Sequence, residues 1–299
     1  MHVVVGGASG LLGRHVVEAF RKRDHTTTKL VRRDPTADDE SRWDPANGVL
    51  DPQVVEDADL VINVAGSPTI GNPHSSRWAR NLRESRVTTT RTLAEAIAGS
   101  ERKPAFLAGN AVAIYGDHGP EQLTEDADSR GHTLMTEVTR EWEAAAAPAR
   151  DAGARVCILR TAPVLDVSSE PLRSLRRLFR LGLGGKVGSG QQYFPVVSLR
   201  DWLGGVVHLA EHPDADGPFN LCCPETPTNA EFTQALARAL GRPAIVPVPA
   251  PLIRIGAGPL APELLGSVNL VPQALIDAGY EFRDHDITAV IAAGLAQAR

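Results

Sequence analysis

The stretch that decides the fold stands at the start of the chain: Val3-Val4-Val5-Gly6-Gly7-Ala8-Ser9-Gly10-Leu11-Leu12-Gly13. It places a G-x-x-G-x-x-G turn between a short apolar strand and a helix that we predict over residues 11–23. Gly7 permits the tight turn, Gly10 lets the backbone approach a pyrophosphate at the helix N-terminus, and Gly13 lets the helix pack close to the sheet. The alternative is a glycine-rich turn without a ligand, but the strand–turn–helix context favours a dinucleotide site. The residues between the glycines that complete the expected cofactor-binding turn are Ser9, Leu11 and Leu12.

The segments that follow this turn alternate between strand and helix patterns. Apolar or β-branched runs predict strands over residues 26–31, 59–64, 105–108 and 155–160. Helical patterns cover residues 78–98 and 134–152. Strands that alternate with helices in this way form parallel sheets that are covered on both faces. We therefore expect an α/β fold with a Rossmann-type, doubly wound parallel sheet.

The domain organisation follows from where this alternation ends, after Arg160. A short helix over residues 171–181 runs into a loop with five glycines over residues 182–190, and prolines become frequent from Cys222 onward. We predict that residues 1–221 form the NAD(P)-binding Rossmann domain and that residues 222–299 form a smaller C-terminal substrate lobe. Residues 164–196 are expected to contribute to that lobe.

The composition limits the classes of partner. A formal net charge of −5 argues against general nucleic-acid binding, which needs a basic surface. The sequence contains no apolar run of the roughly 20 residues that span a membrane, and its first residues do not match a secretory signal. The three cysteines and nine histidines show neither a disulfide framework nor a metal-binding spacing. We expect a cytoplasmic protein without a metal ion, with its oligomeric state left open.

Two arginines follow the second predicted strand and bear on the choice of cofactor. NAD sites usually carry an Asp or Glu here that binds the ribose 2′-hydroxyl. This chain has Arg32-Arg33 instead, and guanidinium groups suit the 2′-phosphate of NADP because they form bidentate, charge-assisted hydrogen bonds. Asp34 is the competing acidic residue but lies one step further out, and a solvated basic loop is the other alternative. The pair favours NADP over NAD.

Many separated motifs resemble one family. The chain is similar to the short-chain dehydrogenase/reductase superfamily in its extended, epimerase-like form, and to an atypical branch whose C-terminal region is a domain of unknown function. The motifs that carry this resemblance are the glycine turn, Trp43-Asp44-Pro45, Ala65-Gly66, Arg77-Trp78, Ser85-Arg86, Tyr115-Gly116-Asp117, Trp142-Glu143, Arg160-Thr161, Gly184-Gly185, Gly217-Pro218-Phe219-Asn220 and Gly241-Arg242-Pro243. The resemblance implies a Rossmann fold, NADP binding and a substrate cleft between the lobes. It extends the expected cofactor contacts to Asp44, Asn63, Ala65, Gly66, Gly109 and Pro163.

The catalytic residues of that superfamily are missing. Extended members place a Ser or Thr four residues before a Tyr-Gly, where this chain has Ala111. They also place Tyr-x-x-x-Lys in the following helix, where the equivalent positions here are Met135 and Thr139. In the family, the tyrosine acts as the general acid/base and the lysine lowers its pKa. Methionine has no transferable proton, so the standard proton-transfer machinery is absent.

Three other side chains are candidates to contact the cofactor or the substrate in the expected cleft. Asn110 could donate to a substrate oxygen near the nicotinamide, or it could be a turn residue. Tyr115 carries the phenol nearest the expected site, as a proton donor or as a packed aromatic whose hydroxyl is satisfied. The amide of Asn63 could order the loop on the cofactor side, or it could simply end a strand.

Two functions agree with these observations. The first is an NADP-dependent oxidoreductase or epimerase/dehydratase that acts on a small polar substrate, with its proton donor outside the usual motif. The second is a non-catalytic NADP-binding redox sensor or interaction module. The missing Tyr-x-x-x-Lys favours the sensor, whereas the retained cofactor turn and a full substrate lobe favour the enzyme. Fold alone does not decide between them.

Overall fold

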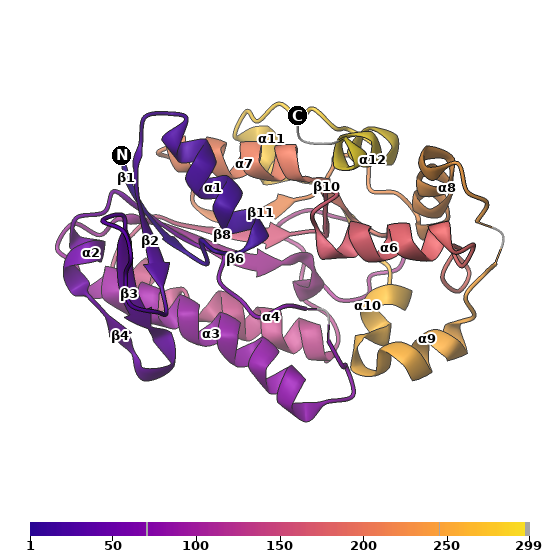
Figure 1. Ribbon diagram of the computed structural model, residues 1–299, viewed down its shortest axis with the longest axis horizontal. Coiled ribbons are helices and arrows are strands. Elements are labelled where there is room, and N and C mark those ends of the chain that lie inside the picture. The colour runs from indigo at the N-terminus through magenta and orange to yellow at the C-terminus, as the bar shows by residue number, and fades with distance from the viewer. Residues whose placement is uncertain (70, 245, 297–299) are drawn as a thin grey trace.

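The computed structural model describes residues 1–69, 71–244 and 246–296 and confirms the predicted α/β fold (Figure 1). Its main sheet has eight strands in the order β11-β8-β6-β5-β1-β2-β3-β4, and neighbouring strands are parallel except for the β3–β4 pair. The strands are β1 (His2–Gly6), β2 (Thr26–Val31), β3 (Glu40–Asp44), β4 (Val49–Leu50), β5 (Leu60–Asn63), β6 (Ala105–Ala111), β8 (Val156–Thr161) and β11 (Gly217–Leu221). This order, which runs outward from β1 in both directions, is that of a doubly wound sheet.

Helices cover both faces of the sheet because successive side chains of a strand point to opposite faces. Val3 and Val5 of β1 pack with α1 (Leu11–Arg21) and α7 (Leu199–Glu211) in one hydrophobic core. Val4 points the other way and packs in a second core with α3 (Ser76–Gly99) and α5 (Ala147–Asp151). A short helix, α2 (Pro52–Glu56), also packs on the α3 side. The two cores together hold the sheet between two layers of helices.

The helix predicted over residues 134–152 is in fact two helices, α4 (Leu134–Ala144) and α5. Pro148 explains the break, since proline has no N–H for the helical ladder and its ring clashes with the preceding turn. Proline is tolerated at the start of a helix, and Pro148 stands in the first turn of α5. The break leaves α4 as a separate helix beside the carboxyl edge of β6.

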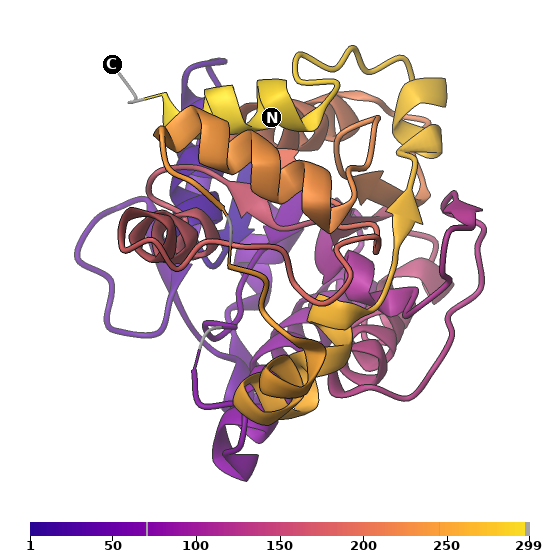
Figure 2. The same ribbon diagram turned by 90° about the vertical axis from the view of Figure 1, so that its right-hand side faces the viewer.

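A third hydrophobic core lies beside the sheet and draws on distant parts of the chain. It joins α6 (Glu170–Arg180), α8 (Asn229–Leu240) and α12 (Ile287–Leu295), with the two short strands β9 (Val164–Leu165) and β10 (Val197–Ser198) next to it. Figure 2 shows α8 directly below α12. The predicted boundary at residue 222 stays a prediction, and residues 245 and 297–299 of the expected lobe lie outside the described residues.

Two helices of the C-terminal region, α9 (Ala250–Ala257) and α10 (Ala261–Leu265), lie on the side of α3 and α4 (Figure 1). The chain then passes through β12 (Asn269–Leu270), which pairs with β7 (Gln122–Leu123), to α11 (Gln273–Asp277), which packs against β11 and lies beside α7 in Figure 1. Within the described ranges, no helix has the length and apolar character that crossing a membrane requires.

The packing of α1 on the sheet depends on the absence of a side chain at Gly13. A β-carbon at this position would lie 2.2 Å from the carbonyl oxygen of Gly7 and 2.7 Å from the α-carbon of Ala8. Both neighbours are backbone, so neither can move aside without shifting the turn. Gly13 therefore fixes how closely the helix approaches the turn.

We expect Gly13→Ala to lower the free energy of unfolding by about 1–3 kcal/mol, the usual effect of overpacking. Gly99→Ala is a matched control, because Gly99 ends α3 and no atom of a described residue lies within 4 Å of its added β-carbon. That control should be neutral or slightly stabilising, since alanine is the better helix former. Urea unfolding of both variants measures the difference, and equal stability would contradict the packing argument.

Candidate functional site

The glycine turn leaves the N-terminus of α1 open. Gly7 has φ +84°, and its carbonyl accepts a hydrogen bond from the N–H of Gly10 at 3.0 Å. Gly10 is the N-cap of α1, and no side chain caps the helix, so the first N–H groups of the helix have no partner in it. A β-carbon at Gly10 would touch only the Gly7 carbonyl, at 3.3 Å, and would otherwise face open space. Free N–H groups beside open space form a site for an anion.

A second loop, which follows β5, lies directly against this turn. A β-carbon at Gly7 would lie 2.6 Å from the backbone nitrogen of Ala65. Asn63 holds the loop in place: its Oδ1 accepts from the Ala65 N–H at 3.1 Å, and its Nδ2 donates to Thr90 at 2.9 Å and Thr89 at 3.3 Å. Asn63 is fully buried, so its amide orders the loop from behind. Gly66, the next residue, is exposed.

The two arginines after β2 have different surroundings. Both amino nitrogens of Arg33 donate to the carboxylate of Glu40, at 2.8 and 2.9 Å, and these bonds hold the pKa of Glu40 at about 2. Arg32 is exposed and forms no hydrogen bond or ion pair with any residue that the structure describes. Asp34, the competing acid, pairs with Arg42 at 2.9 Å. Of these two arginines, Arg32 is therefore the one whose guanidinium is available to bind a ligand.

The other expected cofactor contacts surround the same edge of the sheet. Asp44 ends β3 beside the end of β2, and its carboxylate accepts from Asn47 at 2.7 Å. Gly109 is buried where a β-carbon would lie 2.8 Å from the Asn63 carbonyl, so β6 approaches β5 closely there. Pro163 lies just beyond β8, and its carbonyl accepts from Val197 at 3.2 Å. All three lie at or near the carboxyl ends of their strands, and their contacts with a cofactor stay predictions.

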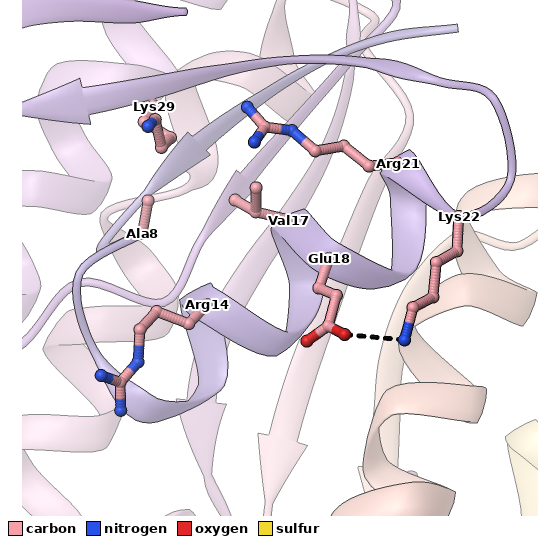
Figure 3. A pocket seen from close by; sticks show the side chains of 7 residues that line it. All are labelled: Ala8, Arg14, Val17, Glu18, Arg21, Lys22 and Lys29. Atoms are coloured by element: carbon pink, nitrogen blue, oxygen red, sulfur yellow. Dashed lines mark ion pairs between the residues drawn. The ribbon is translucent and has the colours of Figure 1, made fainter. Parts of the chain in front are cut away.

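A surface hollow of about 470 Å³ lies beside the turn, between α1 and β2 (Figure 3). Its lining residues are Ala8, Arg14, Val17, Glu18, Arg21, Lys22 and Lys29. Most of its cations have acidic partners, since Lys22 pairs with Glu18 at 2.7 Å, and Lys29 and Arg21 pair with Asp39. The hollow is thus largely an ion-paired surface of α1, and it shares only Ala8 with the glycine turn.

Tyr115 and Asn110 belong to a buried polar network. Asn110, Arg160 and Asn220 stand side by side on β6, β8 and β11. The Tyr115 hydroxyl donates to Asn220 at 2.7 Å and accepts from Arg160 at 2.8 Å. Tyr115 is completely buried, and burial raises the pKa of its phenol to about 12. Its hydroxyl therefore lies among protein groups in this structure.

Glu143 completes the network and accepts hydrogen bonds from Arg160 and Asn110. Its carboxylate accepts from Arg160 at 3.0 and 3.1 Å and from the Asn110 amide at 3.1 Å. The Asn110 Oδ1 accepts from the N–H of Ala111 at 2.7 Å, so both ends of this amide have partners. Met135 and Thr139, at the positions of the missing tyrosine and lysine, are buried in α4. Within the described residues this network joins α4 to three strands.

Two charged residues were given no functional role from the sequence, although Arg86 belongs to one of the quoted family motifs. Arg86 of α3 is 8% exposed and lies beside Gly66. Glu263 of α10 accepts a hydrogen bond from Thr133 at 2.8 Å, and burial raises the pKa of its carboxyl above the ordinary range. Thr133 is the N-cap of α4, two residues before Met135. Nothing in the local sequence predicts this contact, because 130 residues separate its partners.

Removing the buried cation of the network should destabilise the protein strongly. We expect Arg160→Met to cost about 3–5 kcal/mol of unfolding free energy, since it leaves the Glu143 carboxylate without its partner. Arg83→Met is the control, because Arg83 forms only exposed ion pairs with Glu137 and Glu141 and should lose about 1 kcal/mol or less. Urea unfolding compares the two, and similar losses would show that the network contributes little.

Comparison with known proteins gives matches over nearly the whole chain. The model of the NAD dependent epimerase/dehydratase family matches residues 3–222, and that of a domain of unknown function, DUF1731, matches residues 248–293. Epimerase family protein Mb2239 of Mycobacterium bovis is 36% identical over 286 residues, which are 95% of this chain and 94% of the relative. Epimerase family protein SDR39U1 of mouse is 34% identical over 297 residues, covering 97% and 98% of the two chains.

Solved structures agree with these matches. The crystal structure of human epimerase family protein SDR39U1 with NADPH has a TM-score of 0.87 and 29% identity, and the match covers 98% of this chain and 99% of the human one. UDP-glucuronic acid 4-epimerase from Bacillus cereus, in complex with NAD, has a TM-score of 0.73 at 17% identity over 98% and 97% of the two chains, and shows the fold alone. The matches confirm the predicted resemblance to extended short-chain dehydrogenases/reductases.

Proposed function

Because this chain belongs to the NAD dependent epimerase/dehydratase family, we propose that it binds NADP(H) and acts on a small polar substrate. The observation that carries the proposal is the open N-terminus of α1 at Gly10, beside a free guanidinium at Arg32. The first suits a pyrophosphate and the second suits a ribose 2′-phosphate. The NADPH in the human relative supports the same choice of cofactor.

The expected contacts fit a dinucleotide laid across the carboxyl edge of the sheet. Gly6 of β1 pairs with Leu30 of β2 on one side and with Asn63 of β5 on the other, so these three strands end side by side. Ligands of doubly wound sheets bind at this edge, where the strand order diverges. The glycine turn lies in the middle, with Arg32 and Asp44 on one side and the loop of Ala65 and Gly66 on the other.

The proposed reaction needs a proton donor other than the tyrosine that the family normally uses. A bound nicotinamide would supply hydride transfer, and the protein would then have to provide a group that gives a proton to, or takes one from, the substrate oxygen. Glu263 is the proposed donor, since its carboxyl accepts a hydrogen bond from Thr133, the N-cap of α4, and Met135 follows two residues later in that helix. A carboxyl with a raised pKa stays protonated closer to neutral pH, as a general acid requires. Tyr115 remains the alternative donor, with Asn110 as support.

A non-catalytic sensor is the second candidate function. The observation that favours it is that Met135 and Thr139 occupy the usual catalytic positions and that Tyr115 and Asn110 have protein partners. Such a protein would bind NADPH without turnover. The enzyme remains the primary proposal because Glu263, a carboxyl with raised pKa, is hydrogen-bonded to Thr133 at the start of α4, two residues before Met135.

The first test compares the affinities for NADP and NAD. We expect Arg32→Ala to weaken NADP about 10- to 100-fold, the size of a lost charge-assisted hydrogen-bond pair, with little effect on NAD. Arg33→Ala should have a much smaller effect, since Glu40 already holds that guanidinium. The double variant should likewise lose NADP affinity far more than NAD affinity. Titration calorimetry measures all three, and equal losses for the two cofactors would overturn the assignment.

Turnover makes the second test. NADPH is mixed with a panel of carbonyl compounds and sugar nucleotides, and its absorbance is followed. With a substrate found, Glu263→Gln should lower kcat roughly 10²-fold or more, the scale of general acid catalysis, and should leave NADPH affinity unchanged. Tyr115→Phe should keep most of the activity because its hydroxyl already has two protein partners. The reverse result would make Tyr115 the donor, and tight NADPH binding without turnover across the panel would favour the sensor.

A further inference from the structure

Two stretches of the chain carry positive charge without any acidic residue. Residues 171–199 and 232–262 together contain eight Lys or Arg residues and no Asp or Glu, although the whole chain has a formal net charge of −5. The eight are Arg173, Arg176, Arg177, Arg180, Lys186, Arg238, Arg242 and Arg254. Of these, only Arg173 forms an ion pair with a residue that the structure describes. The other charges are left to be balanced by solvent ions or by a partner.

The two stretches lie side by side in the fold. The glycine loop after α6 runs along the residues that lead from α8 to α9: the N–H of Val248 donates to the Lys186 carbonyl at 2.8 Å, and the N–H of Gly188 donates to the Val248 carbonyl at 2.9 Å. The helices α6 and α8 also pack together in the third core. The end of α6, this loop and α9 lie at the right in Figure 1 and face the viewer in Figure 2. The two stretches therefore contribute to one surface.

The same stretches expose large apolar side chains. Six of the ten large apolar residues that are exposed among the described residues belong to them: Leu178, Leu181, Leu183, Val246, Leu252 and Ile255. Leu181, directly after α6, is 72% exposed, and so is Ile255 on α9. Leu252 stands three positions before Ile255 and therefore on the same face of α9, a helix in which no residue is buried. Apolar and positively charged side chains thus occur together on this surface.

These apolar side chains project from the surface and do not line the hollow next to them. That hollow, of about 440 Å³ at the end of α8, is lined by Gln234, Ala237, Arg238, Gly241, Arg242, Pro243 and Ala244. A protein partner would need a matching shape for each projecting side chain, whereas a fluid lipid interface accepts them without one. A nucleic acid would attract the cations but offers exposed leucines no partner. Charge and projecting leucines together favour a lipid surface.

We propose that this surface, formed by Arg177, Arg180, Leu181, Leu183 and Ile255 with their neighbours, docks on a membrane that contains anionic lipids. The arginines bind the negatively charged headgroups, and the leucines and the isoleucine enter the boundary between headgroups and acyl chains. Such binding is peripheral and needs no helix that spans the membrane. It uses none of the residues proposed to bind the cofactor, so its test does not depend on NADPH.

Sedimentation with lipid vesicles tests the charged part of the surface. The wild-type protein should bind vesicles of phosphatidylcholine mixed with phosphatidylglycerol but not vesicles of phosphatidylcholine alone, and added salt should weaken this binding. Arg177→Gln/Arg180→Gln should weaken it about 30-fold, since each cation at an anionic surface contributes about fivefold. Arg91→Gln/Arg150→Gln is the matched control, because both arginines are exposed on other helices and form no ion pair within the described residues. That control should bind like the wild-type protein.

A second pair of variants tests the apolar part at constant charge. Leu181→Asn should weaken binding to the anionic vesicles about 10-fold, because the leucine side chain no longer leaves water. Val49→Asn replaces an exposed apolar residue on β4, away from this surface, and should have no effect. All of these side chains are exposed, so the melting temperatures of the variants should stay close to that of the wild-type protein.

Three results would overturn the proposal. The first is a wild-type protein that does not bind the anionic vesicles. The second is equal binding by a variant and its control, which would show that neither the arginines nor Leu181 contact the lipid. The third is a wild-type dimer in light scattering that Leu181→Asn converts to a monomer, because this would assign the surface to a second copy of the chain.

Discussion

The site depends on direct contact between two backbone segments, the glycine turn after β1 and the loop after β5. Side chains cannot fit between them, since a β-carbon at Gly7 would lie 2.6 Å from the Ala65 nitrogen; the start of α1 is held equally close to the turn, where a β-carbon at Gly13 would lie 2.2 Å from the Gly7 carbonyl oxygen. This closeness places the start of α1 and the loop of Gly66 at one edge of the sheet. Because the contact is made of backbone, it also presents N–H groups rather than side chains to that edge.

The sequence predicted the part of this arrangement that is local. Strand, turn and helix at the N-terminus follow from residue order and glycine spacing, and the alternation of segments was sufficient for a doubly wound sheet. The break between α4 and α5 was missed, although Pro148 marks it. Counting along the chain also showed that Met135 and Thr139 stand where the family places its catalytic tyrosine and lysine.

What the sequence did not predict depends on contacts between distant residues. Glu40 forms an ion pair with Arg33 and not with Arg32. The adjacent pair Arg32-Arg33 in the sequence does not indicate this difference. Tyr115 is held by Asn220, 105 residues away, so its burial follows only from the completed sheet. Glu263 reaches α4 from the C-terminal region. Each of these contacts forms between elements that pack only in the folded chain, so local patterns carry no signal for them.

The two buried arginines of this edge differ in how other described residues compensate their charges. Arg160 donates hydrogen bonds to both carboxylate oxygens of Glu143 and to the hydroxyl of Tyr115, so its charge is compensated within the protein. Arg86 is buried equally well, at 8% exposure, but receives only carbonyls and one hydroxyl. The side chains of Tyr115 and Asn110 belong to the cluster around Arg160, whereas the guanidinium of Arg86 lies behind Gly66, in the loop that touches the glycine turn. Burying a charge without a counter-charge is costly, and among the described residues Arg86 has only these neutral acceptors and the face of the Trp142 ring to offset that cost.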